Sequence, residues 1–410
     1  MRILLVNTFY YPKLIGGAEV SVQLLAEGLK EQKHEVFVIT LGAKDEVVKL
    51  NGVVIIRLKE RNIFSPYSGI KRNLIQKIIW FFIDSGNPFY NSKLGKILKR
   101  IKPDIIHTNN IQGFSPHIWK TFKNMGFPVV HTMRDYYLLC HRCNMHNKLA
   151  NCETLCTPCA FTHYIKKRYM DYPDVFVGIS KFIVNKHRIF GDFSKMKHAK
   201  VVYNAVDMPK STLIKAANEK VVFGFMGRIA EDKGVSYLVE QLRIVHAKFP
   251  DSFSLVLAGK GDDLYLNIIK EKLDGIICHF VGVVSPTEFY KQIDVSIVPS
   301  IWEEPFGRVA IESLAHSVPV CMSSKGGLPE IFNGECAWLF NPENDELSEI
   351  LLEIIDNREL IEQKGKLSKK HVVRFNNENN ITNYLRLYSQ VTNKEDLLHK
   401  DNHDDMHLIV

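Results

Sequence analysis

Runs of apolar residues in the first half of the chain alternate with stretches in which apolar positions recur every three or four residues. The runs RILLVN, EVFVITLG, VVIIRL, DIIHTN, PVVHTM and VFVGIS are short, rich in β-branched residues and typical of buried strands. HAKVVYNAVD, at residues 198–207, continues the series. Between the first two runs, residues 17–34 have the spacing of a helix that buries one face. This alternation predicts a parallel sheet covered on both faces.

The same pattern starts again after a polar stretch at residues 208–220. Strands are expected in VVFGFMGRI, FSLVLAGKG, CHFVGVV, VSIVPS and VPVCMS, and a helix in GVSYLVEQLRIVHAKF. We therefore expect an α/β protein with two doubly wound, Rossmann-like domains, at residues 1–207 and 208–378. A closing helix at residues 379–395 should return toward the first domain, and residues 396–410 should form a flexible tail. Open parallel sheets bind ligands at the carboxyl ends of their strands, so a central cleft faced by both domains is the expected site.

Composition narrows the class of protein further. The chain has 410 residues, of which 46% are apolar and 24% are charged, and its net charge is +8. No apolar run approaches the roughly 18 residues that a membrane-spanning helix needs. The apolar run at the start of the chain is too short for the apolar region of a signal peptide. We therefore expect a cytoplasmic protein. The positive charge favours anionic partners in general, but no nucleic-acid-binding motif is present, and we expect no nucleic acid partner.

One segment, between Lys71 and Lys102, is unusually basic and contains the single acid Asp84 around the apolar stretch LIQKIIWFFI. Its cations are Lys71, Arg72, Lys77, Lys93, Lys96, Lys99, Arg100 and Lys102. Such a segment can dock on an anionic membrane, which would make the protein peripheral on the inner face of the membrane. The more common alternative is an amphipathic helix that packs its apolar face on the domain.

Five of the eight cysteines lie close together in the sequence, within an insertion at about residues 138–162: Cys140, Cys143, Cys152, Cys156 and Cys159. In a cytosolic protein this clustering indicates a metal site more than disulfides. We expect a structural zinc held by Cys140, Cys152, Cys156 and Cys159, with buried reduced thiols as the alternative. Four thiolates leave no open position on the metal, so we expect no catalytic metal.

Two strand-to-helix junctions carry residues suited to an anionic ligand. Gly16 and Gly17 follow the first strand and would let a ligand come close to the start of the next helix. A purely structural turn would give the same sequence pattern. In the second half, Arg228 and Lys233 bracket the junction after VVFGFMG, and two cations there suit a diphosphate. Neither junction has the GxGxxG fingerprint, which argues against a dinucleotide oxidoreductase.

The motifs GGAE, GRIAEDKG, LAGKGD, EPFGRVAIESLA and GGLPE occur in this order along nearly the whole chain. The ordered set resembles the retaining glycosyltransferases of family 4, which have the GT-B fold. The resemblance implies an enzyme that moves a sugar from a nucleotide-diphosphate sugar to a glycan, lipid-linked or other hydroxyl acceptor, in polysaccharide or glycoconjugate synthesis. The first domain would bind the acceptor and the second the nucleotide sugar.

The same resemblance implies roles for single residues, with the donor lying along Glu304 to Glu312. Glu304 would bind hydroxyls of the donor sugar and Glu312 those of the ribose, across a helical span of roughly 12 Å. The amides of Phe306 and Gly307 would begin a helix that faces the diphosphate. The remaining donor-binding residues would be Gly16, Gly17, Arg228 and Lys233. Arg228 and Lys233 would neutralise the leaving diphosphate in place of a metal.

One position departs from the family pattern. Arg134 stands where many members have His, and Asp135 matches the acid that follows. His131 is the nearest imidazole, and it is a candidate catalytic residue together with Asp135, although a lone His on a strand is more often structural. Two other functions stay open: a GT-B nucleotide-sugar 2-epimerase and a non-catalytic nucleotide-sugar-binding subunit.

Overall fold

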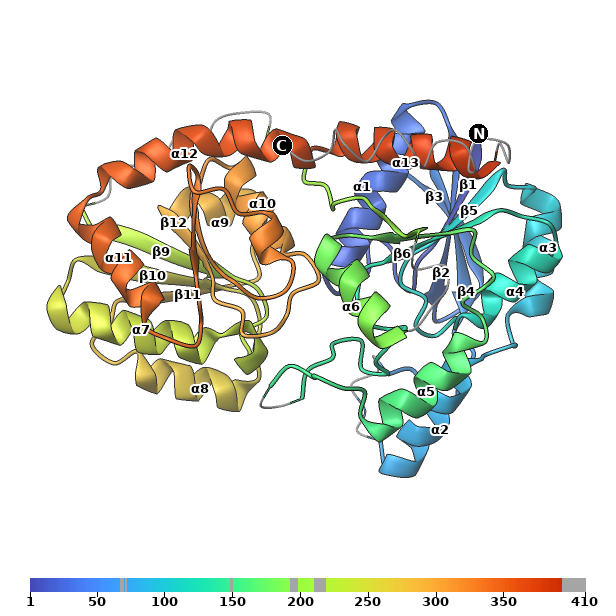
Figure 1. The fold of residues 1–410 in the computed structure, drawn as a ribbon, viewed down its shortest axis with the longest axis horizontal. Helices are drawn as coiled ribbons and strands as arrows, with labels where there is room; N and C mark the ends of the chain where they lie inside the picture. The colour runs from blue at the N-terminus through green and yellow to red at the C-terminus, as the bar shows by residue number, and fades with distance from the viewer. Residues whose placement is uncertain (67–69, 71, 148–149, 192–197, 210–218, 393–410) are drawn as a thin grey trace. The chain divides into compact units, whose positions relative to one another are not determined.

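The computed structural model describes residues 1–66, 70, 72–147, 150–191, 198–209 and 219–392, which form two compact units (Figure 1). The first unit contains Met1–Met145, Glu153–Tyr203 and the chain from Asn377 to the last described residue. The second contains His146–Cys152 and Asn204–Asn376. Lys71, most of the polar stretch at 208–220 and the expected tail lie outside the described residues. No helix in the described part is long and apolar enough to cross a membrane.

The first unit is built on an eight-stranded sheet in the order β3-β4-β2-β1-β5-β6-β7-β8. Its strands are β1 (Arg2–Val6), β2 (Glu35–Gly42), β3 (Glu46–Leu50), β4 (Val53–Lys59), β5 (Ile105–Thr108), β6 (Val129–Met133), β7 (Val175–Gly178) and β8 (Lys200–Val201). Neighbouring strands are parallel, as expected, except that β3 pairs antiparallel with β4.

Two details of this sheet differ from the expectation. The sequence analysis did not predict β3, whose residues EVVKL are half-exposed at the sheet edge and give only a short alternating pattern. The last strand is also much shorter than the expected 198–207, since only Lys200–Val201 pair with β7.

Helices cover both faces of this sheet. Those of the first unit are α1 (Gly17–Glu31), α2 (Leu74–Ser85), α3 (Asn91–Ile101), α4 (His117–Asn124), α5 (Thr157–Lys167), α6 (Lys181–Gly191) and α13 (Asn377–Thr392). α1 and α13 pack in one core with Val36 and Val38 of β2, whose side chains point to the same face of the sheet. α3 lies against the opposite face, where Ile97 lines a hollow together with Phe37. Successive residues of a strand point to opposite faces, which explains this division.

Helix α13 follows the second unit in sequence but belongs to the core of the first. Ile381, Tyr384 and Tyr388 are buried against α1 and the sheet. Gly28 of α1 allows the close approach, because a Cβ atom there would lie 2.2 Å from Cδ1 of Ile381. The last described helix is therefore an integral part of the first unit's core.

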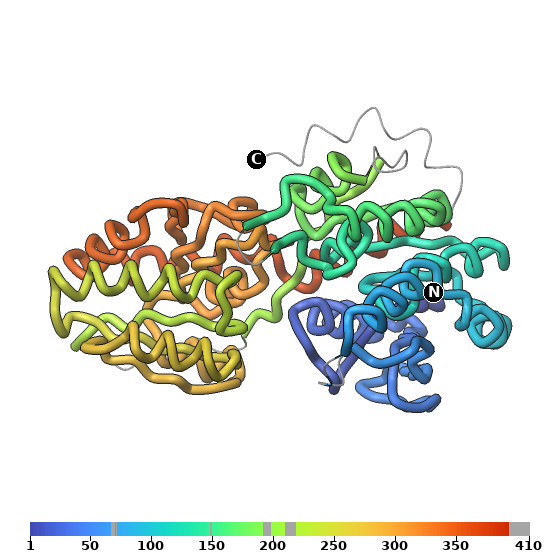
Figure 2. The backbone as a smooth tube through the Cα atoms, turned by 90° about the horizontal axis from the view of Figure 1, so that it is seen from below, coloured from blue at the N-terminus to red at the C-terminus, as the bar shows by residue number. Residues whose placement is uncertain are grey.

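The second unit has a six-stranded, fully parallel sheet in the order β11-β10-β9-β12-β13-β14. Its strands are β9 (Val221–Met226), β10 (Phe253–Ala258), β11 (Cys278–Gly282), β12 (Val295–Val298), β13 (Val320–Ser323) and β14 (Ala337–Phe340). Its helices are α7 (Val235–Lys248), α8 (Asp263–Lys272), α9 (Pro286–Gln292), α10 (Arg308–Ala315), α11 (Glu346–Asp356) and α12 (Glu359–Val372). α7 and α8 lie side by side, as Figure 2 shows, and with α11 they pack on one face of the sheet. The second expected parallel sheet is thereby confirmed.

Candidate active site

The turn between β9 and α7 brings two cations to the carboxyl edge of the second sheet. Arg228 follows β9, and Lys233 ends a short 3₁₀ helix at Glu231–Lys233. Gly234 then starts α7 with φ of 72°, and a Cβ atom there would lie 1.8 Å from the carbonyl oxygen of Pro299. Only glycine fits both this backbone conformation and this approach, so the turn is pressed against the end of β12.

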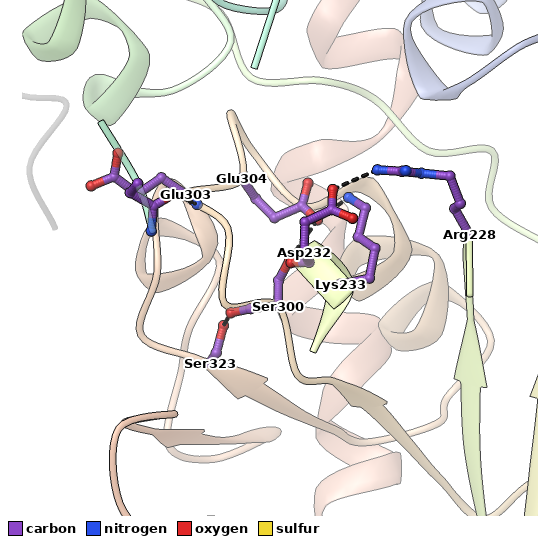
Figure 3. Close-up of polar contacts among 8 residues, drawn as sticks. Arg228, Asp232, Lys233, Ser300, Glu303, Glu304 and Ser323 are labelled. Atoms are coloured by element: carbon purple, nitrogen blue, oxygen red, sulfur yellow. Dashed lines mark hydrogen bonds and ion pairs between the residues drawn. The ribbon is translucent and has the colours of Figure 1, made fainter. Parts of the chain in front are cut away.

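Lys233 and Glu304 form the centre of the site (Figure 3). Nζ of Lys233 lies 2.5 Å from Oε1 of Glu304, which also accepts a hydrogen bond of 3.0 Å from Oγ of Ser300. The ammonium group lies over the ring of Trp302, 4.4 Å from its centroid. Lys233 is thus held between a carboxylate and an aromatic face, with 21% of its side chain exposed.

Arg228 is more open to solvent. Its Nη2 donates a hydrogen bond of 2.5 Å to Oδ2 of Asp232, and 62% of its side chain is exposed. The backbone oxygen of Asp232 accepts from the amide of Trp302 at 3.0 Å, which ties the β9–α7 turn to the loop that carries Glu304. A diphosphate that reaches this edge would therefore meet one exposed and one half-enclosed cation.

The loop from Glu304 to Gly307 is bound on its other side by the GGLPE motif. The amide of Gly327 donates 2.7 Å to the carbonyl oxygen of Glu304. A Cβ atom at Gly326, where φ is 65°, would lie 2.2 Å from that same oxygen. α10 then starts at Arg308, after Gly307 with φ of 107° and the buried Phe306. The segment between the two glutamates is therefore loop for its first half, so the expected helical span of about 12 Å does not apply.

Glu312 is the second carboxylate of the motif, and it lies inside α10. It forms an ion pair of 2.8 Å with Nε of Arg308 one turn earlier, and both side chains are nearly buried. Burial raises the pKa of the Glu312 carboxyl, and the Arg308 charge opposes that rise. Arg308 also donates 2.7 Å to the carbonyl oxygen of Ala205. Glu312 is thus not the exposed glutamate that a bare helix would carry.

A hollow of about 470 Å³ lies beside Arg228 in the second unit. It is lined by Arg228, Ile229, Ala230, Glu231, Lys260, Gly261, Asp262 and Tyr265. The amide of Ile229 donates 2.8 Å to the carbonyl oxygen of Lys260, so the LAGKGD turn lies directly beside the GRIAEDKG turn. The motifs LAGKGD, GRIAEDKG, EPFGR and GGLPE therefore meet at one edge of the second sheet.

The candidate residues of the first unit lie at the corresponding edge of its sheet. Gly16 caps α1, and its amide donates 2.8 Å to the Glu19 carboxylate, with Gly17 next in the helix. Arg134 follows β6, is nearly buried and donates 2.8 Å to Oδ1 of Asn109. Burial raises the pKa of the Glu19 carboxyl, and backbone hydrogen bonds and the charge of Arg134 oppose that rise.

His131 and Asp135 differ in their suitability for proton transfer. His131 lies within β6, is 3% exposed and hydrogen-bonds Oγ1 of Thr108 at 2.9 Å. Burial lowers its pKa to about 3, which keeps the ring neutral, and its catalytic role stays a prediction. Asp135 is partly exposed, and burial of its carboxyl raises the pKa to about 6. It accepts a hydrogen bond of 2.8 Å from the amide of Tyr137.

The cysteine insertion brings several thiols near one another. Cys159 lies within hydrogen-bonding distance of Cys140 and Cys156, and its Sγ is 3.3 Å from Nδ1 of His141. Among the residues that the structure describes, no group of three or more His, Cys, Asp or Glu side chains is arranged to hold a metal ion. The zinc site with Cys140, Cys152, Cys156 and Cys159 stays a prediction, and His141 is an additional neighbour that the spacing of the cysteines did not suggest.

Several polar residues of the site were missed in the sequence. Ser300 and Asp232 bind Glu304 and Arg228, as described above. Asn151, which clusters with the second unit, donates 2.9 Å to the carbonyl oxygen of Ile301 and accepts 3.0 Å from the amide of Glu303. Ser300 follows a strand and Asp232 lies in a charged turn, so the local sequence could have indicated both as site residues. Asn151 is distant in sequence from the loop it contacts, and its local sequence does not indicate a site residue.

Comparison with known proteins agrees with this geometry. Residues 15–209 match the family described as Glycosyltransferase Family 4, and residues 210–371 match the one described as Glycosyl transferases group 1. An uncharacterised 42.6 kDa protein in the cps region of Klebsiella pneumoniae is 35% identical over 81% of this chain and 87% of its own length. A Staphylococcus aureus protein named as a capsular polysaccharide biosynthesis glycosyltransferase, CapM, is 28% identical over 38% of this chain and 43% of its own.

Solved structures share the fold at low sequence identity. Sucrose-phosphate synthase from Thermosynechococcus elongatus superposes with a TM-score of 0.74 at 19% identity, covering 96% of this chain and 99% of that one. Anabaena HepE in complex with UDP and glucose gives 0.69 at 16% identity, over 94% and 99% of the two chains. The fold is therefore GT-B. The chain belongs to glycosyltransferase family 4, and it is a glycosyltransferase.

Proposed function

We propose that this enzyme transfers a sugar from a nucleotide-diphosphate sugar to a hydroxyl acceptor with retention of the anomeric configuration. The observation that carries the proposal is the enclosure of Lys233 between Glu304 and Trp302, with Arg228 on the same turn. A diphosphate binds best to cations, and the hydroxyls of a sugar bind best to a carboxylate or another hydrogen-bond acceptor. The cations and the carboxylate both lie at the carboxyl edge of the second sheet.

Each residue has a defined part in this proposal. Arg228 and Lys233 neutralise charge that develops on the leaving diphosphate, which is the largest electrostatic demand of the reaction. Glu304 accepts hydrogen bonds from the donor sugar, and Glu312 accepts them from the ribose. The amides of Phe306 and Gly307 come just before the first residue of α10, near the end of a helix that favours an anion. Gly16 and Gly17, where α1 begins in the first unit, stay candidates for donor binding.

The bond changes follow a front-face course. The acceptor oxygen forms a bond to the anomeric carbon while the bond from that carbon to the diphosphate oxygen breaks. The acceptor proton passes to an oxygen of the leaving diphosphate. No enzyme nucleophile and no metal are required, and Asp135 is the candidate for any further proton contact on the acceptor side.

The acceptor is proposed to be a growing glycan or a lipid-linked sugar in cell-surface polysaccharide or glycoconjugate synthesis. Support comes from the Staphylococcus aureus relative, whose name refers to capsular polysaccharide biosynthesis. A uridine diphosphate sugar is the first donor to try, because HepE was solved with UDP and glucose.

The proposal is tested with the purified chain and a panel of UDP-, GDP- and ADP-sugars, first by thermal shift and then by product analysis. Binding of one donor class, followed by transfer with an α-product from an α-donor in the proton NMR spectrum, is expected. A product of inverted configuration would refute retention. Conversion of the donor to free nucleotide and a C2-epimerised sugar without acceptor would instead identify the 2-epimerase.

A further inference from the structure

Helix α2 exposes the side that a surface helix normally buries. Of its 12 residues, only Trp80, Asp84 and Ser85 are buried. Five large apolar side chains lie outward, with exposed fractions between 44% and 73%: Leu74, Ile75, Ile78, Ile79 and Phe82. Their spacing of one, three and four residues places them on one face. A contiguous apolar surface of this kind indicates an interaction site.

The apolar surface continues onto α5, which lies beside α2 (Figure 1). Phe161 and Tyr164 of α5 are 55% and 62% exposed. The rings of Phe82 and Phe161 stack at 19°, with centroids 6.3 Å apart, and this contact joins the two apolar faces. We call these seven residues of α2 and α5 the α2–α5 face.

The exposed charged residues within helices α2 and α5 have one sign. Asp84 is the single acidic residue of the two helices, and it is buried. Lys77 and Lys167 are exposed, and the guanidinium group of Arg168 lies 5.1 Å from the ring centroid of Tyr164. The face therefore offers apolar side chains together with cations and no exposed acid of its own.

The inward side of α2 is firmly fixed, so the exposure is not the result of a loosely packed helix. Nε1 of Trp80 donates 2.8 Å to the carbonyl oxygen of Phe64. The hydroxyl of Tyr137 donates 2.9 Å to the carbonyl oxygen of Asp84, and the ring of Phe81 lies 4.5 Å from that of His141. α2 thus packs on the domain with one side and presents the other to solvent.

We propose that the α2–α5 face docks the enzyme on an anionic lipid bilayer. Apolar side chains can enter the interfacial region of the bilayer while neighbouring cations contact acidic headgroups. A symmetric pairing of two copies through the same face would bring Lys77, Lys167 and Arg168 of one copy close to those of the other, which is unfavourable. The proposal goes beyond the proposed sugar transfer and does not rest on it.

The structure also changes which cations of the basic segment take part. Lys93, Lys96 and Arg100 lie on α3 and line a hollow of about 590 Å³ beside the sheet. Lys93 forms an ion pair with Asp45 there. Docking therefore involves α2 and the distant α5, and not the whole of residues 71–102.

The test is sedimentation of the full chain with vesicles of phosphatidylcholine, with and without phosphatidylglycerol, at low and high salt. Binding is expected only with phosphatidylglycerol at low salt. Ile75→Ser with Phe82→Ser should lower the partition coefficient about tenfold or more, since both side chains enter the bilayer. Leu264→Ser with Val283→Ser is the matched control, because these side chains are similarly exposed on the second unit.

Charge variants complete the experiment. Each of Lys77→Gln and Lys167→Gln should weaken binding about fivefold, whereas Lys248→Gln and Lys291→Gln should have no effect. Equal sedimentation of wild type and the Ile75→Ser, Phe82→Ser variant would overturn the proposal. So would a wild-type dimer, measured by light scattering, that this variant converts to a monomer. Binding of a nucleoside diphosphate by the same variant is measured separately, so failure of docking and failure of the donor site can be told apart.

Discussion

At the scale of single residues, Arg228 and Lys233 both place a positive charge on the turn between β9 and α7, although Arg228 is the more exposed of the two. Lys233→Ala and Arg228→Ala should both weaken binding of a nucleoside diphosphate, because each removes a positive charge from the strand edge. A charged hydrogen bond contributes about 1.5–3 kcal/mol, so we expect roughly tenfold to a hundredfold weaker binding. Isothermal titration with nucleoside diphosphates measures this, with Lys248→Ala as the control. Unchanged affinity in both variants would remove these residues from the site.

Glu304 and Glu312 should fail differently when each is changed to Gln. Glu304 is proposed to bind the sugar, whose charge grows in the transition state, so Glu304→Gln should mainly lower kcat. Glu312 is proposed to bind the ribose, which does not change, so Glu312→Gln should mainly raise KM for the donor, equivalent to about 1.5–3 kcal/mol. Steady-state kinetics separates the two. Equal losses of kcat, with KM unchanged in both, would show that the carboxylates act as one unit.

Asp84 predicts a pH dependence of stability in the first unit. Its carboxyl accepts a hydrogen bond of 2.5 Å from the amide of Gly113, and burial raises the pKa of the carboxyl to about 6. The unfolded chain then loses the proton first, so this group's stabilising contribution is complete below about pH 4 and is lost as the pH rises to about 6. The loss amounts to about 3 kcal/mol at most.

Asp84→Asn cannot lose that proton, so its free energy of unfolding should fall less than that of the wild type between about pH 4 and about pH 6.5. Urea unfolding followed by tryptophan fluorescence measures both proteins. Asp135 titrates in the same range in each and cancels in the difference. Parallel curves for the two proteins would contradict the burial of a protonated Asp84.

At the scale of elements, the contact between the GGLPE turn and the Glu304 loop predicts that one added methyl group in this turn destabilises the second unit. Gly326→Ala should destabilise the second unit by about 1–3 kcal/mol and weaken donor binding, because its Cβ meets the backbone of Glu304 at a positive φ. Gly334→Ala is the control, since the nearest atom to its Cβ is 3.8 Å away. Thermal denaturation and nucleotide titration of both variants measure the effect. A Gly326→Ala protein as stable as Gly334→Ala would mean that the turn can move away.

The elements also explain how far sequence could predict this fold and site. Parallel strands buried on both faces give continuous apolar runs, which is why β1, β5, β9 and β12 were evident. β3 was missed because an edge strand that is half exposed leaves little pattern. Arg228, Lys233 and Glu304 were found from their places after strands. Asn109 and Asn151 were not, since their roles come from contacts with residues distant in sequence.

At the scale of the whole molecule, α13 predicts that the first unit needs the end of the described chain. A protein ending at Asn376 would leave the partners of Ile381, Tyr384 and Tyr388 in α1 and the sheet exposed. We expect its first unit to unfold several kcal/mol more easily, because each large buried side chain contributes about 2–5 kcal/mol. The full-length chain is the reference. Limited proteolysis and circular dichroism compare the two, and equal resistance would show that α13 only rests on the surface.

The return of α13 to the first unit also orders events during synthesis of the protein. The ribosome releases the strands of the first sheet long before Asn377, yet their core is completed only by the last described helix. The second unit lies between them, and its described residues between Asn204 and Asn376 contain every strand of its own sheet. The domain made first is therefore finished last, and its apolar core must wait, partly uncovered, while a whole second domain emerges and folds.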